Sequence, residues 1–210
     1  MLYALRAMPR PRSLPPTAPA TAALAVVDRD GLAALSMRAV AAELGVGTMS
    51  LYRYVADRAE LEALAAELVL SGVDVVPPRN ALWDKQVLVL AERVREAVGR
   101  HPNAVPLTTA HRHRCPSAAR WNEAVLEVLT AAGFTGVERA MALRALLGYL
   151  TGAIGLEHQG PPAGDWTGAV AGVVEDHPLL AETAAVARAV SPADGFRRGL
   201  MVVLGGLRRP

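Results

Sequence analysis

A short segment between positions 48 and 54 carries side chains that can contact a nucleic acid. It combines hydroxyl groups, phenols, a thioether and a guanidinium in Thr48, Met49, Ser50, Tyr52, Arg53 and Tyr54. The hydroxyls, phenols and guanidinium donate hydrogen bonds to phosphate oxygens and to base edges, whereas an ordinary solvated helix face carries mainly Glu and Lys. The composition of this segment therefore favours a surface that binds DNA.

Two short helices are expected to position these side chains. Ser36 is a suitable N-cap for the first helix, and the apolar residues after it repeat at helical spacing: Met37, Val40, Ala41 and Leu44. Gly45 follows the last of them, where a left-handed backbone is inexpensive only for glycine. The second helix is expected to begin at about residue 47 or 48, with Leu51 and Val55 turned inward.

A third helix is expected to begin at Arg58, because Asp57 followed by Glu60 is close to a capping box. Helix, glycine turn and helix form the arrangement that places a short second helix in the major groove of DNA. Similar corners also occur in all-α proteins that do not bind DNA, so the geometry alone leaves both alternatives open. Residues 1–58 contain seven arginines and four acidic residues, so this end of the chain is mildly basic.

The run from residue 35 to residue 61 resembles the N-terminal domain of the tetracycline-repressor (TetR) family of transcriptional regulators. The matching stretches are Leu35-Ser-Met-Arg38, Ala41-Ala-Glu-Leu-Gly-Val46 and Ser50-Leu-Tyr-Arg-Tyr-Val-Ala-Asp-Arg-Ala-Glu-Leu61. The resemblance implies base contacts by one set of residues, Arg38, Thr48 and Met49, and phosphate contacts by another, Ser50, Tyr52, Tyr54 and Arg58. The family usually has lysine at the position of Arg58, and a guanidinium keeps the positive charge, so phosphate binding should persist.

The composition is that of a chain with a buried core. The 210 residues suffice for one large or two small domains, and 52% are apolar but only 4% aromatic, so the core should be aliphatic. A net charge of +2 permits DNA binding without arguing for it. A single cysteine, Cys115, excludes an internal disulfide framework and fits a reducing cytoplasm. No apolar run reaches the about 18 residues of a membrane span, and prolines break up the N-terminal segment, so we expect neither a transmembrane helix nor a signal peptide.

The periodicity predicts an all-α fold with three parts. Residues 1–17 are expected to form a disordered basic arm, residues 18–72 a three-helix helix-turn-helix DNA-binding domain, and residues 79–208 a helical ligand-binding and dimerisation domain. Ser71-Gly72 and Pro77-Pro78 mark the boundary between the last two. A flexible connection is expected from residue 160 to about residue 176, followed by a helix from residue 178 to residue 190. The helix that begins at Arg58 is shared by the two domains, so it can transmit a signal between them.

The expected helix at 136–157 carries a ridge of small residues, which comprises Ala145, Gly148, Gly152 and Gly155. Glycines lower helix propensity, and close packing against another helix offsets that cost. The packing partner is either a core helix of the same chain or a second copy of the chain. The stretches Ala132-Gly-Phe134, Leu147-Gly-Tyr-Leu-Thr-Gly152 and Phe196-Arg-Arg-Gly-Leu200 resemble the regulatory domain of the tetracycline-repressor branch. That resemblance implies a homodimer through helices 136–157 and 193–207, with an inducer inside the body.

Candidate ligand contacts lie on the expected helices of the body. They are Trp83, Leu90, His111, Trp121, Val125, Met141, Tyr149, Glu157 and His158. Stripes of this kind more often pack in a core, so each is also a candidate core position. His101, His111 and His113 lie near Cys115, but their spacing does not suit a tetrahedral metal site. We therefore expect no metal and no cofactor, and the residues around His111 do not imply tetracycline as the ligand.

Together these features predict a cytoplasmic homodimeric repressor that a small molecule releases from a palindromic DNA operator, with half-sites about one helical turn (~34 Å) apart or a related distance. The alternative is an all-α protein that binds a hydrophobic ligand, or an enzyme, in which the helix-turn-helix is only a structural corner. Nothing in the sequence supports catalysis, because it has no nucleophile with a base at useful spacing and no glycine-rich phosphate loop. Repression and activation are not distinguished, nor is the ligand identified.

Overall fold

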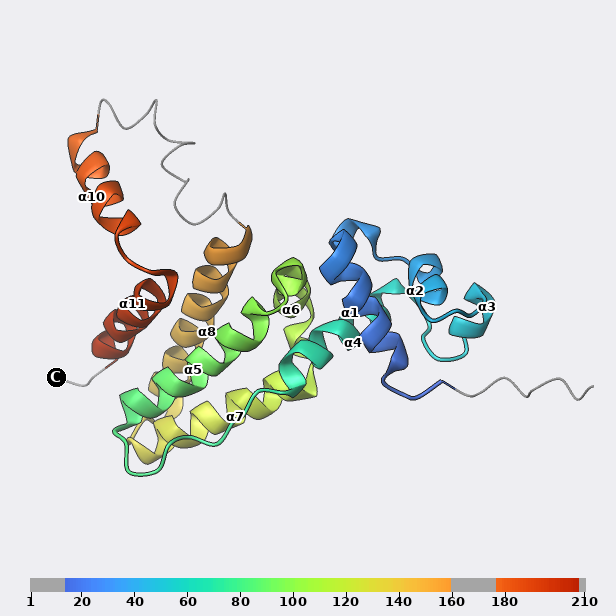
Figure 1. Cartoon of the computed structure of the whole chain (residues 1–210). Coiled ribbons are helices and arrows are strands. Elements are labelled where there is room, and N and C mark those ends of the chain that lie inside the picture. Colours follow the sequence, from blue (N-terminus) through green and yellow to red (C-terminus); the bar gives the residue numbers. More distant parts are fainter. Residues whose placement is uncertain (1–13, 160–176, 208–210) are drawn as a thin grey trace, which may run out of the picture.

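The computed structural model describes residues 14–159 and 177–207, and all regular structure in these ranges is helical (Figure 1). The head comprises α1 (Ala18–Asp30), α2 (Met37–Glu43), α3 (Thr48–Leu51) and α4 (Arg58–Ser71). The body comprises α5 (Trp83–Gly99), α6 (Val105–His111), α7 (Pro116–Ala131), α8 (Gly136–Gln159), α10 (Pro178–Arg188) and α11 (Pro192–Gly206). Short 3-10 turns connect some of them: η1 (Leu32–Ala34), η2 (Pro102–Ala104) and η3 (Arg112–Arg114). The predicted all-α fold is confirmed.

Side-chain caps define the helix starts of the head. The Ser36 hydroxyl accepts a hydrogen bond from the Ala39 amide at 3.1 Å, and the Asp57 carboxylate accepts one from the Glu60 amide at 2.8 Å. The Glu60 carboxylate in turn accepts from the Ala56 amide at 2.6 Å, so two amide donors at this helix start are satisfied. The caps expected from the sequence are confirmed.

Two buried side chains hold the four-residue helix α3 on the head. A helix this short is not stable by itself in water, so its conformation depends on packing. Leu51 at its last position is fully buried, and Val55 just beyond it is 2% exposed. Both contact the aliphatic core formed by α1, α2 and α4, which includes Val26, Val27, Leu35, Val40 and Leu61. Fully burying a leucine or valine contributes about 1.5–3 kcal/mol, so Leu51 and Val55 together can anchor α3 on the head.

Three carboxylates of the head contact the body. The pairs are Asp28 with His101 Nδ1 at 2.7 Å, Glu62 with His111 Nε2 at 3.0 Å, and Glu67 with the Ser117 amide at 3.0 Å. The first carboxylate belongs to α1 and the other two to α4, while their partners lie just before η2, at the end of α6 and at the start of α7. The head is therefore joined to the body at several points along α4 as well as through the chain itself.

Two polar residues of α5 differ from the sequence prediction. The sequence predicts a helix from residue 81 to residue 98, with Asp84 and Arg95 opposite its apolar stripe, on the solvent side. Asp84 is instead 2% exposed, and its carboxylate accepts a hydrogen bond from the Lys85 amide at 2.9 Å. A carboxylate in the first turn of a helix interacts favourably with the free amides there, which compensates for its burial. Arg95 is half-buried because it pairs with Glu157 of α8.

The remaining expectations concern the chain ends and connections. The predicted arm, up to residue 13, and the predicted connection at 160–176 lie outside the described residues. Within the described ranges, no helix combines the length and the apolar character that a membrane span requires.

Candidate DNA interface and ligand cavity

Helices α2 and α3 form a helix-turn-helix at the opposite end of the molecule from α10 and α11 (Figure 1). Gly45 in the turn has a φ of 65°, the left-handed conformation that the sequence predicts. With Leu51 buried, the rest of α3 faces outward: Met49 is 79% exposed and Tyr52 is 47% exposed. Thr48 and Ser50 are half-buried beside them. The four residues predicted to contact DNA from this region therefore lie together on or beside one short exposed helix.

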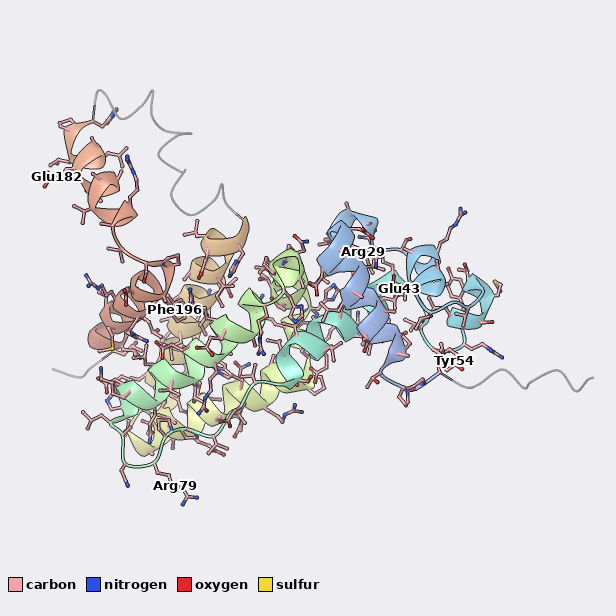
Figure 2. The ribbon with its side chains drawn as sticks, viewed as in Figure 1. Arg29, Glu43, Tyr54, Arg79, Glu182 and Phe196 are labelled. Atoms are coloured by element: carbon pink, nitrogen blue, oxygen red, sulfur yellow. The ribbon has the colours of Figure 1, made fainter. Side chains whose placement is uncertain are left out.

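The other predicted DNA contacts surround α3. Arg38 on α2 is exposed, and none of the ion pairs among the described residues includes it, so its guanidinium is available to a base or a phosphate. Tyr54, seen at the edge of the head in Figure 2, accepts a hydrogen bond from the Leu14 amide at 3.2 Å. Its hydroxyl hydrogen remains able to donate to a phosphate. Arg29, in contrast, pairs with Glu43 at 2.9 Å and thereby fixes α1 to α2 (Figure 2).

Arg58 at the start of α4 is already engaged. Its Nε donates to Glu62 at 2.8 Å, and its side chain is 49% exposed. The second oxygen of the Glu62 carboxylate lies 3.0 Å from His111 Nε2 on α6. A chain of contacts, Arg58 to Glu62 to His111, thus leads from the predicted phosphate contact into the body. A DNA phosphate must compete with Glu62 for the guanidinium of Arg58.

A cavity of about 100 Å³ lies inside the body, below the C-terminal end of α4. Helices α5, α6, α7 and α8 complete its walls. The apolar lining residues are Leu70, Val73, Val94, Val98, Ala118, Trp121, Leu147, Leu150 and Ile154. The polar ones are Thr108, Thr109, Arg112, Ser117, Asn122 and Thr151. An apolar cavity with a few converging polar groups is typical of a small-molecule site.

Among the predicted ligand residues, Trp121 alone lines this cavity. Its indole Nε1 donates to the Leu90 carbonyl at 2.9 Å, which fixes the ring against α5. The others lie elsewhere: Leu90 and Val125 are fully buried, Trp83 packs on Phe134, Met141 is 50% exposed, and Tyr149 donates to the Phe196 carbonyl. Sequence reasoning missed the threonines of α6, Arg112, Asn122 and Thr151. For the two threonines and Arg112 the only signal was a short polar stretch that lacks a clear helical period, whereas Asn122 and Thr151 lie in the long helices α7 and α8.

Glu157 and His158 line a separate polar cleft with Arg95 and Arg100. Arg95 donates to both carboxylate oxygens of Glu157, at 2.8 and 2.5 Å, and lies 5.5 Å from the centre of the Phe196 ring. This bidentate pair joins α5 to α8 and is mostly buried. Among the described residues, no cluster of His, Cys, Asp and Glu has the arrangement of a metal site.

The lone cysteine is not poised for nucleophilic chemistry. Cys115 is buried, and its burial raises the pKa of the thiol to about 11, with the negative charge of Glu67 adding to the effect. Only the thiolate is a strong nucleophile, so at neutral pH this residue is inert.

One stripe of α8 consists of apolar residues and glycines and is exposed within the described part of the protomer. It comprises Val137, Met141, Gly148, Gly152 and Leu156, which recur at helical spacing and include side chains 76% and 78% exposed at its two ends. At Gly148 and Gly152 an added Cβ atom would meet nothing within 4 Å. Helix α11, which packs beside α8, also exposes Val202. We call residues 137, 141, 148, 152 and 156 the α8 stripe.

Comparison with known proteins identifies the family. Residues 21–65 match the model for bacterial regulatory proteins of the tetR family, and residues 76–210 match the tetracyclin repressor-like C-terminal domain. The chain belongs to the TetR family. It is therefore a DNA-binding transcriptional regulator and not an enzyme, as the sequence predicted.

Individual relatives agree with this assignment. The repressor DrrR1 of Streptomyces coeruleorubidus is 36% identical over 138 residues, which cover 63% of this chain and 49% of that protein, so the match spans about half of that relative. The class A tetracycline repressor from transposon 1721 of Escherichia coli is 30% identical over 202 residues, covering 93% of this chain and 91% of that one. The structure of Streptomyces coelicolor ActR in complex with actinorhodin superposes with a TM-score of 0.80 at 25% identity, covering 94% and 96% of the two chains.

Proposed function

We propose that this TetR-family regulator is a homodimeric repressor that leaves a palindromic operator when a small molecule fills the cavity below α4. The observation that carries the proposal is the position of α4. Its first residue, Arg58, lies beside the helix-turn-helix, and Leu70 near its end lines the cavity. A helix of this length spans about 20 Å, so one rigid element connects the DNA-binding surface with the ligand site.

Ligand entry should move α4 because the cavity is small. Its volume of about 100 Å³ is well below the roughly 300–1,000 Å³ of sites that take drug-sized molecules. A larger ligand must displace the walls, and both Glu62 and Glu67 connect those walls to α4. Rotation of α4 then changes the separation of the two α3 helices in a dimer. Since half-sites lie about one helical turn (~34 Å) apart, a changed separation weakens operator binding.

The relatives support a ligand-controlled repressor. DrrR1 is named as a repressor, and ActR is described in complex with a small molecule, actinorhodin. We assign base contacts to Arg38, Thr48 and Met49, and phosphate contacts to Ser50, Tyr52, Tyr54 and Arg58. The dimer is assigned to α8 and α11, because the α8 stripe is exposed in the protomer. A regulator of this kind acts on DNA, so we place it in the cytoplasm, without a cofactor.

The test compares arginine variants on specific and random DNA. The probes are the DNA upstream of the protein's own gene and a random duplex of equal length, measured by fluorescence anisotropy over a range of salt concentrations. Arg38→Ala should lower the affinity for the upstream DNA by about 10-fold, equivalent to about 1.4 kcal/mol, and reduce the preference over random DNA. Arg58→Ala should weaken binding to both duplexes and reduce the salt slope by about 1 per protomer.

Arg79→Ala is the matched control, because Arg79 is an exposed arginine in the loop before α5, far from the head (Figure 2). It should leave both affinities unchanged. Two results would rule out the proposed function. One is an equal loss of affinity for the upstream DNA in Arg38→Ala and Arg79→Ala. The other is that the wild type does not bind the upstream DNA even at low salt.

A further inference from the structure

The cavity below α4 has apolar walls and a single charged residue. Of its fifteen lining residues, all in the described part of the chain, nine are apolar, five are neutral and polar, and one is charged, Arg112. No carboxylate is among them. The aliphatic side chains and the indole of Trp121 favour a ligand with an apolar body, because such surface gains free energy when it leaves water.

Arg112 is held at the edge of this cavity. It opens η3 directly after α6, and its Nη1 donates to the Thr109 carbonyl at 2.7 Å. This bond satisfies a carbonyl at the end of α6, and the side chain, which is exposed, also lines the cavity. A guanidinium has five N–H donors, so four remain for other acceptors. Within residues 14–159 and 177–207, none of the ion pairs involves Arg112.

The surrounding charges leave this edge positive. Glu67 lies behind the wall, where its carboxylate accepts hydrogen bonds from the Ser117 amide and hydroxyl at 3.0 and 2.5 Å. Arg120 donates to the same hydroxyl oxygen at 2.7 Å and offsets the negative charge of Glu67. Glu62, the other carboxylate on this side of α4, contacts His111 and is paired with Arg58. The arginines Arg112, Arg114 and Arg120 therefore outnumber the carboxylates around this edge.

We infer that the ligand of this cavity is an apolar molecule with one anionic group, and that this group pairs with Arg112. A carboxylate or sulfonate presents two oxygens that match the fork of a guanidinium, and such charge-assisted pairs are stronger than neutral hydrogen bonds. The apolar body then lies against Trp121 and the aliphatic walls. The inference rests on the proposed function only in treating this cavity as the regulatory site.

Two dyes with the same apolar skeleton test the inference. One is 8-anilinonaphthalene-1-sulfonate, an anion, and the other is N-phenyl-1-naphthylamine, which lacks the sulfonate and is neutral. Both are titrated by fluorescence into the full-length protein. Arg112→Gln should weaken binding of the anionic dye by about 10-fold and leave the neutral dye within about 2-fold, because only the charged pair is lost. Arg112→Lys should keep most of the affinity for the anion.

Two further variants test whether the effect depends on Arg112 itself and whether the dyes bind in this cavity. Arg114→Gln removes an equal charge from the same turn without lining the cavity, so it should affect neither dye. Ala118→Phe adds bulk to the cavity wall and should weaken both dyes. The inference is overturned if Arg112→Gln affects both dyes equally or neither, if Arg114→Gln matches it, or if neither dye binds at a site sensitive to Ala118→Phe.

Binding to upstream DNA is measured in parallel with the same proteins. If the wild type and Arg112→Gln both bind that DNA while the dyes show no dependence on Arg112, the ligand inference fails and the proposed function stands. If the wild type does not bind the DNA at low salt, the proposed function fails, whereas the dye selectivity still reports the chemistry of the cavity.

Discussion

Arg58 forms an ion pair with Glu62 in the free protein, although the partner proposed for it is a DNA phosphate. The existing pair is an exposed contact between residues four apart on a helix, and such pairs contribute only about 0.3–0.5 kcal/mol. A phosphate that releases bound counterions outweighs an interaction of this size. The pair therefore orients Arg58 in the free protein without preventing its transfer to DNA.

The buried thiol of Cys115 makes the stability of the protein depend on pH. Burial, and to a smaller extent Glu67, raises the pKa of its thiol from the usual 9.0 to about 11, while Arg114 acts in the opposite direction. The folded state thus favours the protonated thiol. Its contribution to stability is complete below about pH 9 and is lost as the pH rises towards about 11.

The expected outcome is slow modification of Cys115 by a thiol reagent at about pH 8 in the folded protein and fast modification in urea. The melting temperature of the wild type should also fall more steeply above pH 9 than that of Cys115→Ala. Equal modification rates in the folded and unfolded protein would contradict the buried, protonated thiol.

At the residue scale, sequence reasoning succeeded where both partners lie within a few positions. Ser36, Gly45 and Asp57 were assigned correctly because a cap or a left-handed turn depends on the next three or four residues. It failed for Arg95, whose partner Glu157 is 62 positions away. No local pattern distinguishes an arginine that will be buried in such a pair from one that stays in solvent.

Among the elements, α4 connects the proposed DNA contact with the body, and Glu62 makes contacts on both sides of this connection. Its carboxylate holds Arg58 on the DNA side and His111 on the body side. Glu62→Gln removes a negative charge close to the proposed phosphate contact and releases Arg58. Affinity for both upstream and random DNA should therefore rise by about 2- to 5-fold at low salt, with the gain lost as salt screens the charges.

Glu67→Gln, which removes the same charge further along α4 at the contact with Ser117, is the control and should change DNA affinity less. Both variants are measured by fluorescence anisotropy. Weaker DNA binding by Glu62→Gln at every salt concentration would show that Glu62 has to hold Arg58 for the contact to form.

At the element scale, the helices were predictable and the cavity was not. Periodicity, prolines and glycines placed the helices of the body to within a few residues, as for the predicted 178–190 and the observed α10 (Pro178–Arg188). The cavity, however, combines side chains from α4, the residues after it and four other helices. A helical stripe indicates which face is buried but not which neighbour it meets, so Trp121 was the only predicted ligand residue that lines it.

For the whole molecule, the α8 stripe predicts how the protomers associate. Within residues 14–159 and 177–207, a Cβ atom added at Gly148 or Gly152 meets nothing within 4 Å, so the fold should tolerate leucine at both positions. A second α8 packed closely on these glycines has no room for the larger side chains. The double variant should sediment as a monomer with unchanged helical content, whereas the wild type sediments as a dimer.

Ala119→Leu, on an exposed position of α7, adds similar bulk elsewhere and should leave the dimer intact. A double-glycine variant that remains fully dimeric at micromolar concentration would show that another surface joins the protomers.

In the proposed dimer, two copies of this chain present their α3 helices to one operator. Footprinting of the DNA upstream of the gene is the decisive experiment. We expect two protected half-sites of related sequence about one helical turn (~34 Å) apart, lost with Arg38→Ala and with the double-glycine variant. Protection of a single unpaired site, or no site distinguished from random DNA, would contradict it.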